Sequence, residues 1–339
     1  MSTETETETA AETAAGRGLL DRLRASPFLS QLLSNRLAVV GLSIIFGMLL
    51  VALYARFVLV APDFGLLFEA PRAFVQGMVS PDISLLTRSR LGTGVPDRAA
   101  PGWTVSGVPA NERLFGTDAS ARDIYRRNLY GAWLALKFGT ITVGLSTVAG
   151  VGLGIIAAYY GDVTDNVIMR TMDVLLAFPS LLLALALVAI FGAGLWKAVA
   201  ALTLVYTPRF ALVVRGAALK VLEDEYVDAT VALGAADPRV LVRHILPNTL
   251  APITVQSTLN FGLAIIDLAA LSFLGFGAQA GEPSWGLMLD RGVTNGLQTG
   301  KWWMSFFPGL FLAITVLGFN LLGDGMRDAL DPRMREAVD

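Results

Sequence analysis

Long runs of apolar residues dominate the chain and are separated by shorter polar stretches. A helix that spans a lipid bilayer needs about 20 mostly apolar residues, and six segments meet this requirement. They lie near residues 37–60, 132–160, 174–194, 198–219, 250–277 and 303–322. The pattern therefore predicts an all-α integral membrane protein with six transmembrane helices.

The apolar runs also divide the chain into parts with different expected roles. The first residues alternate threonine with glutamate and offer too little apolar surface to fold alone. The expected parts are a disordered or amphipathic cytoplasmic leader (1–35), transmembrane helix 1 (36–60), an irregular extracytoplasmic insertion between helices 1 and 2 (61–131), a core of transmembrane helices 2 to 6 (132–323) with a cytoplasmic loop (220–249), and a cytoplasmic tail (324–339).

The distribution of basic residues predicts the orientation of the chain, because short loops rich in lysine and arginine stay in the cytoplasm. With six spans, the leader, the loops after the second and fourth spans, and the tail fall on one side. Their basic residues are Arg17, Arg22, Arg24, Arg36, Arg170, Lys220, Arg239, Arg243, Arg327, Arg333 and Arg335. The insertion is basic too, but long loops translocate largely regardless of charge. Both termini are therefore expected in the cytoplasm.

Composition excludes several kinds of chemistry. Hydrophobic residues make up 54% of the chain and charged residues only 16%, against about 25% in ordinary soluble domains. With no cysteine and a single histidine, thiol chemistry and multi-histidine zinc sites are excluded. The net charge of -2 gives no sign of nucleic-acid binding. No glycine-rich phosphate loop is present, so we expect no catalytic residue, metal or cofactor on this chain.

The loop between the fourth and fifth spans has the pattern of a helical hairpin. Gly234 is expected at the turn between two short amphipathic helices, and Asp237 before Pro238 is expected to cap the second one. The apolar positions are Val227, Val231 and Leu233 in the first helix and Val240, Leu241 and Ile245 in the second. Acids on the first helix and bases on the second suit docking to another protein, and a solvated connector is the alternative.

Four sequence elements, in order along the chain, together resemble the permease subunits of ABC importers. They are Gly116-Thr117-Asp118 with Arg122-Asp123 and Tyr130-Gly131; Asp228-Ala229-Thr230 with Gly234 and Ile245-Leu246-Pro247; Leu271-Ser272-Phe273-Leu274-Gly275-Phe276-Gly277 with Pro283-Ser284-Trp285-Gly286; and Arg327-Asp328-Ala329-Leu330-Asp331-Pro332-Arg333. The second element resembles the EAA loop, which in this family forms a coupling helix seated in a cleft of the ATPase. The chain is most similar to the C-type permeases of dipeptide, oligopeptide and nickel importers.

The chain departs from the family pattern at a few positions. Asp228 stands where glutamate is usual, and Thr230 stands where a second alanine is usual. His244 occupies the position at which isoleucine is expected. Leu268 replaces a frequent glutamate, and an acid occurs one position earlier, at Asp267. One residue turns a helix by about 100°, so a role of that carboxylate cannot be carried over unchanged.

The resemblance implies a type I ABC importer permease fold that works by alternating access in a prokaryotic plasma (inner) membrane. It implies a B-type permease as heterodimer partner, two ABC ATPases that hold ATP and Mg, an extracytoplasmic solute-binding protein and surrounding lipid. The cargo expected is dipeptides or oligopeptides, with nickel chelates or glutathione as alternatives. The residues expected to couple to the ATPase are Glu225, Asp228, Ala229, Thr230, Gly234, Asp237, Arg243, His244 and Pro247.

Two ionisable residues, Arg209 and Asp267, fall well inside predicted spans, where charges are costly and mark functional sites. They are expected either to face the translocation path or a partner, or to pair with each other. An integral-membrane enzyme is disfavoured because it leaves the hairpin unexplained. A secondary transporter is disfavoured because no internal repeat of the spans is visible.

Small residues and prolines in the spans predict how the helices pack and bend. Five glycines in the second span are expected where helices approach closely; they are Gly139, Gly144, Gly150, Gly152 and Gly154. Pro179 in the third span and Pro208 in the fourth are expected to kink their helices.

Overall fold

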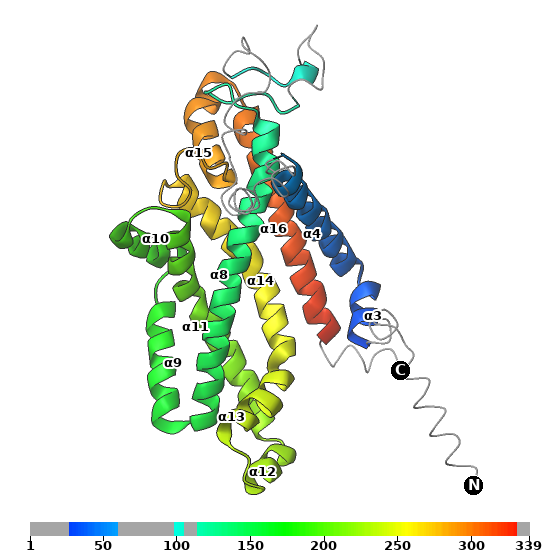
Figure 1. Cartoon of the computed structure of the whole chain (residues 1–339), viewed down its shortest axis with the longest axis vertical. Coiled ribbons are helices and arrows are strands. Elements are labelled where there is room, and N and C mark those ends of the chain that lie inside the picture. The colour runs from blue at the N-terminus through cyan, green and yellow to red at the C-terminus, as the bar shows by residue number, and fades with distance from the viewer. Residues whose placement is uncertain (1–26, 60–97, 105–113, 331–339) are drawn as a thin grey trace, which may run out of the picture.

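The computed structural model of the chain describes residues 27–59, 98–104 and 114–330. Most of the predicted leader, the larger part of the predicted insertion and the end of the predicted tail lie outside the described residues. The described part is helical, with no strand among these residues, and its long helices pack side by side in an elongated bundle (Figure 1).

The described helices follow one another in this order: α3 (Pro27–Ser34), α4 (Arg36–Tyr54) continued by the π-helix η1 (Ala55–Leu59), the 3-10 helix η2 (Gly102–Thr104), α8 (Ile124–Tyr160), α9 (Asp162–Leu176), α10 (Ser180–Phe191), α11 (Leu195–Leu222), α12 (Glu225–Ala232), α13 (Asp237–Val240), the π-helix η3 (Leu241–Ile245), α14 (Leu246–Phe273), α15 (Trp285–Asn295), the 3-10 helix η4 (Leu297–Thr299) and α16 (Trp303–Leu330).

Within the described residues, five helical segments are long and apolar enough to cross a membrane, and a bent pair of helices supplies a sixth candidate. This agrees with the predicted all-α membrane protein. The five segments are Arg36–Leu59, Ile124–Tyr160, Leu195–Leu222, Asp237–Phe273 and Trp303–Leu330.

The third predicted span differs from the expectation. We expected one helix over residues 174–194, but the chain bends by 91° between α9 and α10. Pro179 precedes α10 directly, and its missing N–H and fixed φ favour a break at this point. Arg170, which we expected in a cytoplasmic loop, lies inside α9.

The turn that precedes α8 explains one of the four recognised elements in structural terms. The Asp118 carboxylate accepts hydrogen bonds from the backbone N–H groups of Ser120 and Arg122 and from Arg122 Nε at 2.7 Å. Asp123 caps α8 by accepting from the N–H of Tyr125, and burial raises the pKa of its carboxyl. The cap starts α8 at Ile124, eight residues before the expected start of the second span.

Glycines allow α8 and α11 to approach each other closely. A Cβ added at Gly150 would lie 2.4 Å from Phe210 Cβ, and one added at Gly154 would lie 2.6 Å from the Ala211 carbonyl oxygen. By contrast, Gly144 and Gly152 have nothing within 4 Å of an added Cβ. Only part of the glycine set in this helix is therefore needed for close approach.

Candidate functional site

A helical hairpin, α12 and α13, stands at the end of the bundle opposite α15 (Figure 1). Gly234 follows α12 with a φ of +82°, a left-handed conformation that glycine adopts without steric cost. The N–H of Ala235 donates to the Thr230 carbonyl, and the N–H of Gly234 donates to the Val231 carbonyl. This pair of bonds is a Schellman motif, so the turn expected at Gly234 is formed by backbone geometry that glycine favours.

The inner face of the hairpin packs on the ends of the long helices. Val227, Val240 and Ile245 are fully buried, and they share one apolar cluster with Val214 of α11 and Ile155 of α8. Burying such side chains stabilises by roughly 1.5 to 3 kcal/mol each. The hairpin is therefore held as a firm extension of α8 and α11.

The outer face of the hairpin is open. Leu233 is 89% exposed, and Val231, two residues before it in α12, is 47% exposed. Two of the predicted coupling residues, Thr230 and His244, are half-buried. The remaining ones are exposed, and they are Glu225, Asp228, Ala229, Gly234, Asp237, Arg243 and Pro247.

The second helix of the hairpin continues into the fifth span. We expected that span to begin near residue 250, but α13, η3 and α14 form one segment, Asp237–Phe273. Pro247 lies where the π-helix η3 passes into α14. The hairpin and α14 are therefore joined by continuous helical backbone.

Polar contacts within the hairpin involve residues that the sequence patterns did not single out. Asn248 Nδ2 donates to Tyr226 Oη at 2.9 Å and to the His244 carbonyl at 2.7 Å. Tyr226 also lies beside His244, with ring centroids 6.1 Å apart. The signal that could have revealed them is their spacing: His244 and Asn248 are one helical turn apart.

Asp237 does not act as the helix cap that we expected. The cap position of α13 is Ala236, and Asp237 is already helical. Its carboxylate instead accepts hydrogen bonds from Tyr159 Oη at 2.9 Å and from Tyr160 Oη at 3.2 Å. A contact across 77 residues of sequence left no local signal in the chain.

The two intramembrane charges are joined through a third residue. Tyr206, which is fully buried, donates from its hydroxyl to Asp267 Oδ2 at 2.7 Å. The Arg209 guanidinium lies over the Tyr206 ring, 5.3 Å from its centroid. Among the described residues Arg209 and Asp267 form no ion pair with each other, so of the alternatives that we expected a direct pair is not found, and Tyr206 lies between the two charges.

We expect Tyr206→Phe to lower the stability of the chain by about 1 kcal/mol, because the half-buried Asp267 carboxylate loses the hydrogen bond from Tyr206. The measurement is the midpoint of thermal unfolding of the purified protein in detergent. Tyr54→Phe is the matched control, since Tyr54 is exposed and no hydrogen bond of its hydroxyl is found in the described part of the chain. Equal midpoints for the two variants would contradict the bridging role.

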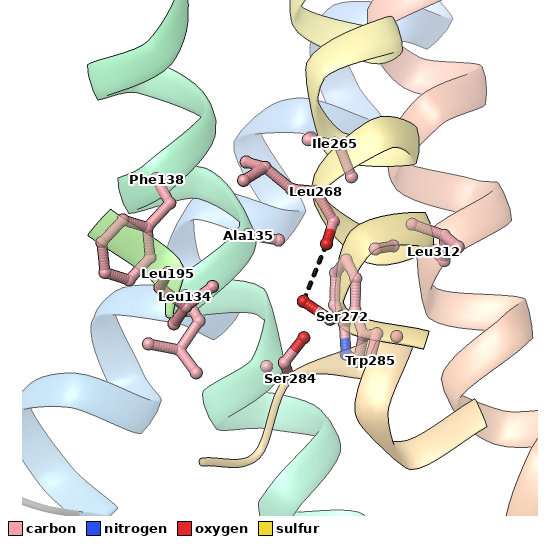
Figure 2. Close-up of a pocket in the computed structure, with 13 residues that line it drawn as sticks. Leu134, Ala135, Phe138, Leu195, Ile265, Leu268, Ser272, Ser284, Trp285 and Leu312 are labelled. Atoms are coloured by element: carbon pink, nitrogen blue, oxygen red, sulfur yellow. Dashed lines mark hydrogen bonds between the residues drawn. The ribbon is translucent and has the colours of Figure 1, made fainter. Parts of the chain in front are cut away.

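A small cavity lies between α8 and the helices α14, α15 and α16 (Figure 2). Its volume is about 20 Å³, which is room for about one water molecule. Its lining is largely apolar, and the Ser272 hydroxyl beside it donates to the Leu268 carbonyl at 2.7 Å. The cavity is therefore a gap in helix packing and is too small to hold a cargo molecule.

The described chain is a bundle of membrane-length helices with a packed helical hairpin at one end. Residues 150–336 match the model of the family described as binding-protein-dependent transport system inner membrane component. The chain belongs to this family, whose members are permeases of ABC importers. The resemblance predicted from the sequence motifs is thereby confirmed.

The names of two relatives agree with this family. The chain is 42% identical over 305 residues to the dipeptide transport system permease protein DppC of Alkalihalophilus pseudofirmus, covering 90% of this chain and 88% of that protein. It is 43% identical to DppC of Escherichia coli, covering 70% and 78%. A chain of the MetNI methionine ABC transporter in an inward-facing conformation covers 60% of this chain and 97% of its own, with 17% identity and a TM-score of 0.49.

Proposed function

We propose that this permease imports dipeptides or oligopeptides, and that the hairpin α12–α13 couples its helices to ATP hydrolysis on partner chains. The observation that carries the coupling proposal is the hairpin itself. Its inner face is buried against α8 and α11, and its outer face presents Leu233 to solvent. An exposed apolar tip on a firmly anchored element suits insertion into a groove of another protein.

The electrostatic pattern of the hairpin supports a protein partner. Glu225 and Asp228 lie in the first turn of α12, where acids also favour the helix dipole. Both are exposed, and no salt bridge of either is found among the described residues. Basic residues of an ATPase subunit are their natural complement, because charge complementarity guides association and register.

The assembly that we propose contains this chain, a second permease subunit of the B type, two ABC ATPases carrying ATP and Mg, and an extracytoplasmic solute-binding protein. We place it in a prokaryotic inner membrane with both termini in the cytoplasm. The hairpin then faces the cytoplasm, and α15 faces the opposite side. The peptide cargo is supported by the names of the relatives, which include a putative peptide transport system permease protein of Brucella suis at 45% identity.

The proposal is tested by purifying the tagged chain from its own cells and reconstituting the purified complex into liposomes. We expect ATPase subunits to co-purify, and we expect ATP-driven uptake of a labelled dipeptide when the binding protein is added. Parallel uptake assays with a nickel chelate and with glutathione test the two alternative cargoes. Absence of ATPase chains from the preparation would contradict the coupling proposal, and uptake of only an alternative cargo would contradict the peptide assignment.

A further inference from the structure

The contact between α8 and the hairpin is built from two neighbouring phenols and one carboxylate. Tyr159 and Tyr160 are the last two residues of α8, and their rings meet edge to face with centroids 5.2 Å apart. Each hydroxyl donates to a different oxygen of Asp237, at 2.9 Å and 3.2 Å. Both carboxylate oxygens therefore have a partner on α8.

The position of Asp237 gives this contact its importance. Asp237 is the first residue of α13, and α13 continues without a break into α14. The carboxylate therefore sits at the base of the segment that carries hairpin motion into the membrane.

The other end of α8 is also fixed. Asp123 caps its first turn, and the tight turn before it is tied to α16, because Trp303 Nε1 donates to the Thr117 carbonyl at 3.3 Å. The 37-residue helix thus runs as one rod from the hairpin to the far end of the bundle. Whatever moves its hairpin end also acts on that distant turn.

We propose that Tyr159, Tyr160 and Asp237 form a joint through which the hairpin moves α8 together with α14. This inference rests on the proposed coupling function and deepens it. With the joint intact, a displacement of α13 is passed to two helices that reach the opposite face of the membrane. Without it, the displacement passes to α14 through the continuous helix, and α8 follows only through apolar packing.

The joint can be removed while its rings are kept. Tyr159→Phe combined with Tyr160→Phe deletes both donors and preserves the ring contact. We expect the reconstituted complex to assemble and to hydrolyse ATP. Because the two hydrogen bonds to Asp237 are lost, we expect it to take up about tenfold less peptide per ATP hydrolysed. Asp237→Ala is expected to give the same ratio, and Asp237→Asn, whose amide can still bond to both phenols, a ratio within about twofold of the wild type.

Two exposed residues provide matched controls. Tyr54→Phe removes a phenol from α4, and Asp324→Asn neutralises an acid on α16; both are expected to leave the uptake ratio unchanged. A double phenylalanine variant with the wild-type ratio would overturn the joint. A preparation from which no ATPase co-purifies overturns the coupling function instead, so the two failures are distinguishable.

A distance measurement tests the joint without relying on transport rates. The chain contains no cysteine, so spin labels can be attached at Val148→Cys on α8 and Ala236→Cys beside α13, both exposed positions. We expect one unchanged distance with and without ATP when the joint is intact, and a nucleotide-dependent change in the double phenylalanine background. A distance that changes already with the joint intact would show that the two elements move independently, which overturns the inference.

Discussion

Replacing Gly234 by proline is expected to abolish ATP-driven uptake while leaving the chain folded in the membrane. Proline fixes φ near −65°, whereas the hairpin turn requires +82° at this residue. Proline also has no N–H, so the bond from Gly234 to the Val231 carbonyl is lost. The hairpin would then meet its partner in the wrong direction, although the buried residues on its inner face stay in place.

The size of the effect can be graded along a series of substitutions at this turn. Alanine at Gly234 costs about 1 to 2 kcal/mol for the left-handed conformation, so we expect reduced uptake, and asparagine, which tolerates that conformation, should be milder. Gly216→Ala in α11 is the matched control, because an added Cβ there meets nothing within 4 Å. Asp228→Arg on the exposed face is expected to uncouple as well. The prediction fails if the proline variant takes up cargo at the wild-type rate per ATP.

Alanine at Gly150 is expected to destabilise the membrane bundle more than any other single methyl group added to α8. The new Cβ would lie 2.4 Å from Phe210 Cβ and 2.7 Å from the Thr207 carbonyl oxygen, and backbone cannot move aside as a side-chain tip can. Overpacking of this kind costs about 1 to 3 kcal/mol. A second alanine at Gly154, against the Ala211 carbonyl, should add to the loss because it wedges the same helix pair apart.

The same helix offers its own controls. Gly144 and Gly152 have open space at the Cβ position, so alanine there should be neutral or stabilise by up to about 1 kcal/mol through its better helix propensity. The measurement is the thermal midpoint of the purified chain, together with its yield from the membrane. Equal midpoints for the variants at Gly150 and Gly152 would contradict the close contact between α8 and α11.

Features that depend on residues close together in the sequence could be predicted. Apolar length located the spans, and Gly234 was recognised because only a turn explains a glycine between two amphipathic patterns. Pro179 marked a bend in advance, but not its size, since a 91° break depends on what α10 packs against. The glycines of α8 predicted close approach without showing which of them face α11.

The contacts that join distant segments could not be predicted in this way. Asp237 before Pro238 has the pattern of a helix cap, and nothing near it in the sequence indicates that two tyrosines from the end of α8 occupy its oxygens. Tyr206 was overlooked for a similar reason. Arg209 and Asp267 attracted attention as charges inside spans, while the neutral residue that bridges them did not.

Neither arm of the bent pair is long enough to cross a bilayer by itself. At 1.5 Å per residue, α9 is about 22 Å long and α10 about 18 Å, against a hydrocarbon core of about 30 Å. By contrast, α8 is about 55 Å long. The helices therefore differ in length around the bundle, and where a helix is shorter than the hydrocarbon core the bilayer thins or flanking side chains reach out to the interface. Each ångström of mismatch costs a fraction of a kcal/mol, so the acyl-chain length of the host membrane enters the energetics of this permease.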